Sequence, residues 1–118
     1  MKRDMGKVRA LLLLYERGVD IAAHDLDAAG ISTDEHAEYV KLLAEAGFVR
    51  DLIDTSTVFG ESYTHNGITS AGHDFLDAVR DDRAWRYIQT YIDDVGGLPT
   101  TIVQELGEKW LKNAGRCA

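Results

Sequence analysis

The chain is poor in residues that could form covalent cross-links or act as a thiol catalyst. Its 118 residues include one cysteine, Cys117, so no disulfide can form within the chain. Sparse cysteine use of this kind is typical of proteins in a reducing cytoplasm. The sequence around Cys117 offers no histidine that could activate the thiol, which argues against a role as a nucleophile.

Long apolar segments are also missing. The longest apolar run spans residues 10–15, whereas a membrane-spanning helix needs about 20 apolar residues. The first residues, MKRDM, are charged, and no apolar core of a signal peptide follows them. We therefore expect a cytoplasmic protein that does not enter membranes.

Recognisable catalytic motifs are absent as well. The sequence holds no P-loop, no GxGxxG, no GxSxG and no HExxH pattern, and its histidines form no pair with metal-ligand spacing. Asp74, Asp77 and Asp81 fall on one stripe of a predicted helix, but no second cluster accompanies them. Arg80 and Arg83 are expected to pair with this stripe locally. We predict a protein that is not an enzyme and that has no catalytic residues, no metal site and no cofactor.

The negative charge is concentrated in one part of the chain. The net charge is −7, and residues 20–54 alone hold nine acidic and two basic side chains. The first seventeen residues are basic instead, and they include Lys2, Arg3, Lys7 and Arg9. Because a phosphate backbone attracts lysine and arginine, the acidic segment is expected to repel nucleic acid.

The spacing of apolar residues predicts two helices in the first half of the chain. Residues 4–17 carry apolar side chains three and four positions apart, which is the pattern of an amphipathic helix. A second helix is predicted over residues 33–46. It begins after Ser32, which has the spacing of a capping box with Glu35. Gly47 ends this helix, because glycine tolerates a positive φ.

A β-ribbon is predicted to follow the second helix. Residues 48–53 and 63–68 have the composition of two strands, and a polar connection over residues 55–60 joins them. The apolar side chains of Val58 and Phe59 indicate that the ribbon extends into this connection. The pair Asn66-Gly67 is a signal for a turn or a kink.

The rest of the chain is predicted to be helical. Thr69 or Ser70 caps the first of these helices, a break is expected at residues 81–82, and Pro99 suits the first turn of the last helix. Three apolar side chains on one side of the last helix form a candidate dimer seam: Ile102, Leu106 and Trp110. These side chains cover the core of their own chain or, alternatively, need a second chain to cover them.

Four phrases of the sequence resemble one family. They are MKRDM, EHAEYVKLLAEAGFV, ITSAGHDFLDAVRDDRAW and GGLPTTIVQELGEKWL, of which the pattern TxxGHDFLD is the most specific. Together they resemble, over nearly the whole chain, a domain-of-unknown-function family of short phage and prophage proteins with a winged-helix-like core. The resemblance implies an origin in a mobile genetic element and a place in the cytoplasm of a bacterial host cell. It implies no activity.

Residues 20–30 are read as a short element, either a short strand or a helix of one or two turns. The order helix, short element, capped helix, β-ribbon, helix is that of a winged helix. We therefore predict an α+β fold, with a winged-helix-like core over residues 1–95 and two additional C-terminal helices. Residues 96–118 are predicted to form a helix that packs on this core or on a second subunit.

In a DNA-reading winged helix, the helix over residues 33–46 would enter the major groove. Base edges are usually read by arginine, lysine, asparagine or glutamine. The polar residues of this helix that we assign to partner binding are mostly acidic: Asp34, Glu35, Glu38, Lys41 and Glu45. This acidic face is either simply solvated or engages the basic surface of another protein.

The leading hypothesis is a non-catalytic phage or prophage protein that acts by protein–protein contact through its acidic surface. Such a protein could inhibit a host defence, in the manner of an anti-CRISPR, or a nucleic-acid-handling complex. The alternative is a winged-helix transcriptional regulator. In that case DNA would be contacted by the basic residues near the N-terminus: Lys2, Arg3, Lys7 and Arg9.

Overall fold

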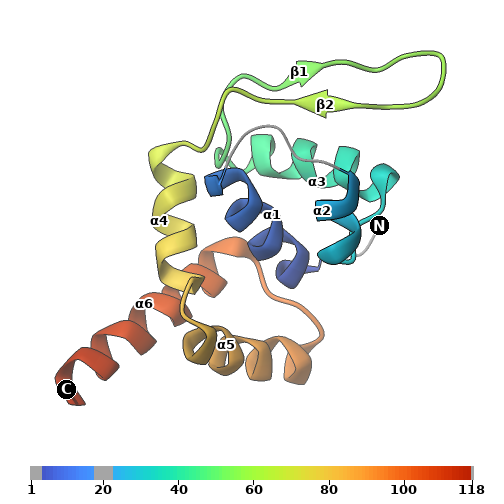
Figure 1. Cartoon of the computed structure of the whole chain (residues 1–118). Helices are drawn as coiled ribbons and strands as arrows, with labels where there is room; N and C mark the ends of the chain where they lie inside the picture. Colours follow the sequence, from blue (N-terminus) through green and yellow to red (C-terminus); the bar gives the residue numbers. More distant parts are fainter. Residues whose placement is uncertain (1–3, 18–22, 118) are drawn as a thin grey trace. The chain divides into compact units, whose positions relative to one another are not determined.

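Six α-helices and one small antiparallel sheet make up the part of the chain that the computed structural model describes, residues 4–17 and 23–117. The elements are α1 (Met5–Arg17), α2 (Ala23–Ala28), α3 (Thr33–Glu45), β1 (Ile53–Asp54), β2 (Tyr63–Thr64), α4 (Ser70–Val79), α5 (Asp82–Val95) and α6 (Thr100–Cys117) (Figure 1). This content confirms the α+β class. No helix among these residues is both long enough and apolar enough to cross a membrane.

The chain divides into two compact units. We call Gly6–His73 the helix–ribbon unit, and Met1–Met5 together with Asp74–Ala118 the C-terminal unit. The boundary between them lies within α4. The boundary predicted after residue 95 falls inside the C-terminal unit, and the division of the chain at that point stays a prediction.

The core of the helix–ribbon unit is built from the apolar stripes of its helices. The buried side chains of α1 within this unit recur at the predicted spacing and are Val8, Leu11, Leu12 and Tyr15. Those of α3 are Ala37, Tyr39, Val40, Leu42 and Leu43. Because both stripes face inward, the polar side chains of α3 are left on its outer face.

The predicted capping box fixes where α3 begins. The Glu35 N–H donates to the Ser32 hydroxyl at 3.1 Å, and the Ser32 N–H donates to the Glu35 carboxylate at 3.2 Å. Gly47, with a φ of 78°, allows the chain to leave the helix and turn into the ribbon. Both ends of the predicted helix are therefore confirmed to within a residue.

The β-ribbon, Val49–Ile68, is longer than its two named strands. Pairs with a constant register run from its base at Val49 and Ile68, through β1 and β2, to Thr57 and Gly60 at the tip. The hairpin turn is therefore Val58-Phe59, and Asn66-Gly67 lies in the returning strand. There the Asn66 amide donates to the Asp51 carboxylate at 3.0 Å, beside the positive φ of 54° at Asp51.

α4 starts on the helix–ribbon unit through a tight backbone contact. The Thr69 hydroxyl accepts the Gly72 N–H at 3.1 Å and donates to the Gly47 carbonyl, so Thr69 is the predicted cap. Gly72 lies directly against the backbone of Phe48, because a Cβ on Gly72 would come within 2.3 Å of the Phe48 carbonyl oxygen. Only glycine fits at this position.

Within the C-terminal unit, α4 and α6 meet at a second close backbone contact of the same kind. A Cβ on Gly107 of α6 would come within 2.1 Å of the Ala78 carbonyl oxygen of α4. α5 contacts α6, and its first turn is capped by Asp81, whose carboxylate accepts the Arg83 N–H at 2.7 Å. The predicted break before this helix is confirmed, and α5 ends at Gly96, which has a φ of 83°.

Candidate protein-binding surface

The partner-binding residues that the sequence predicts are all on α3. Asp34, Glu38 and Glu45 are exposed, whereas Glu35 and Lys41 are half-buried. Glu35 is engaged on two sides, because it closes the capping box and forms an ion pair with Lys7. The hydrogen bond from Lys7 is the main cause that lowers the pKa of Glu35 below its usual value. Glu35 therefore has a structural role in addition to any role in binding.

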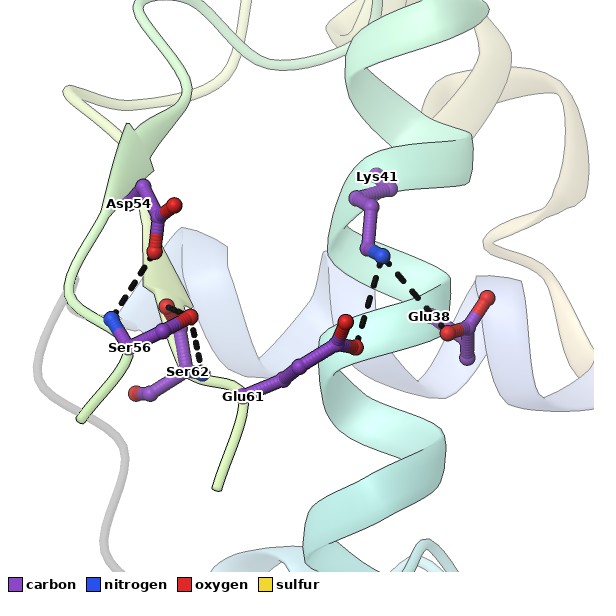
Figure 2. Close-up of polar contacts among 6 residues, drawn as sticks. All are labelled: Glu38, Lys41, Asp54, Ser56, Glu61 and Ser62. Carbon is purple, nitrogen blue, oxygen red and sulfur yellow. Dashed lines mark hydrogen bonds and ion pairs between the residues drawn. The ribbon is translucent and has the colours of Figure 1, made fainter. Parts of the chain in front are cut away.

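Lys41, the one lysine of α3, is enclosed by carboxylates. Its ammonium lies 3.6 Å from Glu38 on the same helix and 3.4 Å from Glu61 on the ribbon (Figure 2). It also lies 4.9 Å from the centre of the Tyr63 ring. Although partial desolvation opposes it, the charges of Glu38 and Glu61 raise the pKa of Lys41 above its ordinary value. The positive charge of α3 is therefore neutralised within the molecule.

The ribbon next to this ion pair is stabilised by local hydrogen bonds. The Ser56 N–H donates to the Asp54 carboxylate at 2.8 Å. The Ser56 side chain, and after it this backbone bond, lowers the pKa of Asp54 below its ordinary value. The Ser62 N–H donates to the Ser56 hydroxyl at 3.0 Å, and that hydroxyl donates to the Ser62 carbonyl at 3.2 Å (Figure 2). These bonds hold the two strands together between β1 and the tip.

Carboxylates from α3 and from the ribbon thus share one surface of the helix–ribbon unit. We call it the acidic face and define it by five exposed residues: Asp34, Glu38, Glu45, Asp54 and Glu61. The three carboxylates on α3 were predicted from the sequence as partner-binding residues. Asp54 and Glu61 were not. Glu61 joins the α3 residues because the ribbon brings it to Lys41, and Tyr63 was likewise not assigned to the site.

The tip of the ribbon carries two apolar side chains in solvent. Val58 is 96% exposed and Phe59 is 95% exposed. The turn that presents them is closed by the Thr57 N–H donating to the Gly60 carbonyl at 3.0 Å and by the reverse bond at 3.1 Å. A further bond runs from the Phe59 N–H to the Thr57 hydroxyl at 3.2 Å. The adjacent apolar pair at 58–59 was visible in the sequence, but not its exposure.

The residues predicted to contact nucleic acid do not gather into a basic patch in the described chain. Lys2 and Arg3 lie outside the described residues. Lys7 is on α1 and pairs with Glu35, and Arg9 is half-buried on the same helix with an interaction partner of its own. α1 therefore directs at least one of its positive charges to α3.

The candidate dimer seam lies on α6 in the C-terminal unit. Ile102 is exposed, whereas Leu106 and Trp110 are half-buried. The guanidinium of Arg83 stacks over the Trp110 ring at 5.4 Å from its centre. Pairing with a second chain at these residues stays a prediction.

A group of aromatic and imidazole side chains is buried beneath the ribbon. The Tyr15 hydroxyl and His36 Nε2 are 2.8 Å apart, and the ring of His65 lies edge-on to Tyr15 with 4.3 Å between centres. Desolvation lowers the pKa of both histidines, and the neighbouring charge of His65 adds to the effect at His36. Burial raises the pKa of the Tyr15 phenol above its ordinary range. All three rings are thus kept neutral near pH 7.

This group does not have the form of a metal site. The Gly67 N–H donates to His65 Nδ1 at 3.0 Å, so in the neutral ring the proton sits on Nε2. His65 Nε2 is buried without a hydrogen-bond partner and offers no lone pair in this tautomer. Within residues 4–17 and 23–117, no three histidine, cysteine, aspartate or glutamate side chains are grouped closely enough to hold a metal ion.

Comparison with known proteins connects the chain to sequences without an assigned activity. Residues 2–99 match the family described as "Hypothetical protein (DUF2513)". A protein of Haemophilus influenzae with the name "Uncharacterized protein" is 30% identical over 94 residues, which cover 78% of this chain and 79% of the relative. No solved structure matches the chain.

Proposed function

We propose that this chain, which belongs to the DUF2513 family, is a non-catalytic binding protein, and the geometry of the acidic face is what supports this. In this proposal the acidic face docks on the basic surface of another protein. The observation that carries it is the enclosure of Lys41 by Glu38 and Glu61, which leaves the outer side of α3 with uncompensated carboxylates.

The charge of the helix–ribbon unit supports this choice over nucleic acid. Its sequence holds five basic and eleven acidic side chains, a net charge of −6. A surface of this kind accelerates encounter with a positive partner and repels phosphates. Binding of DNA through α3 would place its carboxylates against the backbone charges that dominate affinity.

We further propose a winged-helix-like core and an origin in a phage or prophage. In such a core α3 corresponds to the helix that enters a DNA groove and the ribbon corresponds to the wing. A negative surface at this position suits a partner whose basic surface otherwise holds nucleic acid. Inhibition of a host defence, in the manner of an anti-CRISPR, or of a nucleic-acid-handling complex in the bacterial cytoplasm is the biological role we propose.

The test compares two variants that change the charge equally. The first reverses the α3 carboxylates (Asp34→Lys, Glu38→Lys, Glu45→Lys), and the second reverses Asp93, Glu105 and Glu108 in the C-terminal unit. Each is first checked for wild-type helix content by circular dichroism. Proteins captured from a bacterial lysate by the wild type should be lost with the first variant and kept with the second.

A parallel measurement addresses the transcriptional regulator. Fluorescence anisotropy with a labelled DNA duplex is recorded at increasing salt concentration. We expect no binding at physiological salt. Tight binding with a steep salt dependence, unaffected by the α3 reversal, would establish the regulator and refute the docking role of the acidic face.

A further inference from the structure

We propose that the tip of the β-ribbon is the apolar anchor of the docking surface, and that Val58 and Phe59 enter a hydrophobic pocket with a basic rim on the partner protein. This inference rests on the proposed function and adds the part of the contact that fixes the complex once charges have brought it together. The charges govern encounter, whereas the anchor governs how long the complex lasts.

The exposure of the tip favours a role in binding. Eight large apolar side chains are exposed in the described chain, and four of them lie on the ribbon: Leu52, Ile53, Val58 and Phe59. Turns are usually made of glycine, proline, asparagine, aspartate and serine, which adopt the turn conformation or hydrogen-bond to its backbone, so two large apolar residues here are not explained by the turn itself. At 96% and 95% exposure, Val58 and Phe59 contribute almost nothing to the fold, so their burial is available for binding.

The turn that carries the tip is already ordered in the free protein. Two backbone bonds join Thr57 and Gly60, and the Thr57 side chain accepts the Phe59 N–H. Below the turn, the hydrogen bonds between Ser56 and Ser62 hold the strands in register. An anchor that is held in place before binding loses little conformational entropy on binding, which is the condition for a strong contact.

The charges around the tip identify the kind of partner. Asp54 and Glu61 flank the tip on the two strands, and both are exposed. A bilayer with anionic lipids and a nucleic acid would each place negative charge against these carboxylates. A second copy would bring together two helix–ribbon units with a net charge of −6 each. An apolar pocket surrounded by lysine or arginine on a protein satisfies both the tip and the carboxylates.

The first experiment asks whether the tip touches a protein. The photoreactive residue p-benzoylphenylalanine replaces Phe59 in the full chain, and it replaces the exposed Tyr91 of α5 as a matched control. Irradiation in a bacterial lysate should give a crosslinked protein at Phe59 that is absent at Tyr91. Equal crosslinking at both positions, or none at Phe59, would overturn the anchor.

The second experiment separates the anchor from the charges. The partner identified by crosslinking is purified separately. The rates at which it associates with and dissociates from the wild type and each variant are measured by surface plasmon resonance at several salt concentrations. The Val58→Ser/Phe59→Ser variant should dissociate at least about tenfold faster, with the salt dependence of association unchanged. The α3 reversal should slow association and remove its salt dependence, with a smaller effect on dissociation.

The two variants distinguish failure of the anchor from failure of the proposed function. If the tip variant behaves as the wild type while the α3 reversal weakens binding, the proposed anchor is wrong and the proposed docking role of the acidic face is retained. If only the tip variant weakens binding, the acidic docking surface is wrong. Wild-type behaviour of both variants rejects both.

Three further measurements test whether the tip instead binds a membrane, a nucleic acid or a second copy of the chain. The wild type and the tip variant are compared for sedimentation with phosphatidylcholine vesicles, for binding to a DNA duplex, and for oligomeric state by light scattering. We expect no difference in any of them. A vesicle, duplex or dimer interaction that is lost in the tip variant would assign the tip to that occupant and overturn the protein pocket.

Discussion

The two units of the chain distribute their charged and titratable groups differently. The helix–ribbon unit has a net charge of −6 and contains all four histidines, whereas the C-terminal unit has eight basic and nine acidic residues and a net charge of −1. In the helix–ribbon unit the ion pairs of Lys7 with Glu35 and of Lys41 with Glu61 join different elements. In the C-terminal unit Arg80 pairs with Asp77 three residues away, as the sequence predicted.

This difference is the reason for assigning the proposed docking surface to the helix–ribbon unit. Local pairs on an exposed helix balance their own charge and contribute little to stability. A surplus of carboxylates on one unit repels itself and is unfavourable in the free protein. A partner of opposite charge would remove that repulsion, which is why the proposed docking surface lies on the helix–ribbon unit.

The largest effect is expected from a feature found in both units, a helix glycine that lies directly against a backbone carbonyl. Gly72→Ala and Gly107→Ala each force a methyl group against a backbone carbonyl that cannot rotate away. Each should lower the free energy of unfolding by about 2–3 kcal/mol, measured by urea denaturation. His73→Ala and Lys109→Ala, at exposed neighbouring positions, serve as controls and should leave stability almost unchanged. If either glycine variant is as stable as its control, the close approach in that unit is incorrect.

A smaller effect is expected when the pH is lowered. It should destabilise the helix–ribbon unit, which contains His36 and His65, more than the C-terminal unit. Because burial lowers the pKa of His36 and His65 below the value of about 6.5 for an unfolded chain, the unfolded state binds more protons below that pH. The stability that these histidines provide is therefore complete above that pH and is lost as the pH falls below it. Urea denaturation at a series of pH values measures the loss.

A double variant provides the control for this pH dependence. His36→Gln keeps a partner for the Tyr15 hydroxyl, and His65→Asn keeps an acceptor for the Gly67 N–H. The free energy of unfolding of the double variant should change less between neutral and mildly acidic pH than that of the wild type. Hydrogen exchange should locate the wild-type loss of protection in α3 and the ribbon rather than in α5. Equal loss in both units would contradict the assignment to the histidines.

The smallest expected effect concerns the local pairs of the C-terminal unit. Asp77→Ala removes the partner of Arg80 on an exposed helix surface. It should change the free energy of unfolding by less than about 0.5 kcal/mol, at low and at high salt alike. Thermal unfolding followed by circular dichroism is sufficient to measure it. A loss of more than about 1 kcal/mol would show that this pair is not merely local.

The local features of the fold could be predicted from the sequence. The cap at Ser32, the cap at Thr69 and the break before α5 depend on side chains within three residues of the backbone groups they bind. The apolar spacing of α1 and α3 likewise gave their buried faces. Such signals are contained in short windows of sequence, and the structure confirms them.

The features that depend on strand register could not be predicted in the same way. The turn at Val58-Phe59 lies inside the connection predicted over residues 55–60, but nothing in the sequence showed that Val49 pairs with Ile68. The same register brings Glu61 to Lys41. Register is set by contacts between distant residues rather than by local preference. For this reason the sequence identified the carboxylates of α3 but missed those of the ribbon.

The ribbon has one further consequence, for the handling of the protein. The described sheet has two strands, so each of them is an edge strand with no further strand beside it. Negative side chains at Asp51, Asp54 and Glu61 oppose such pairing between neighbouring molecules. We therefore expect variants that neutralise these three carboxylates to associate edge to edge more readily than the wild type in concentrated samples.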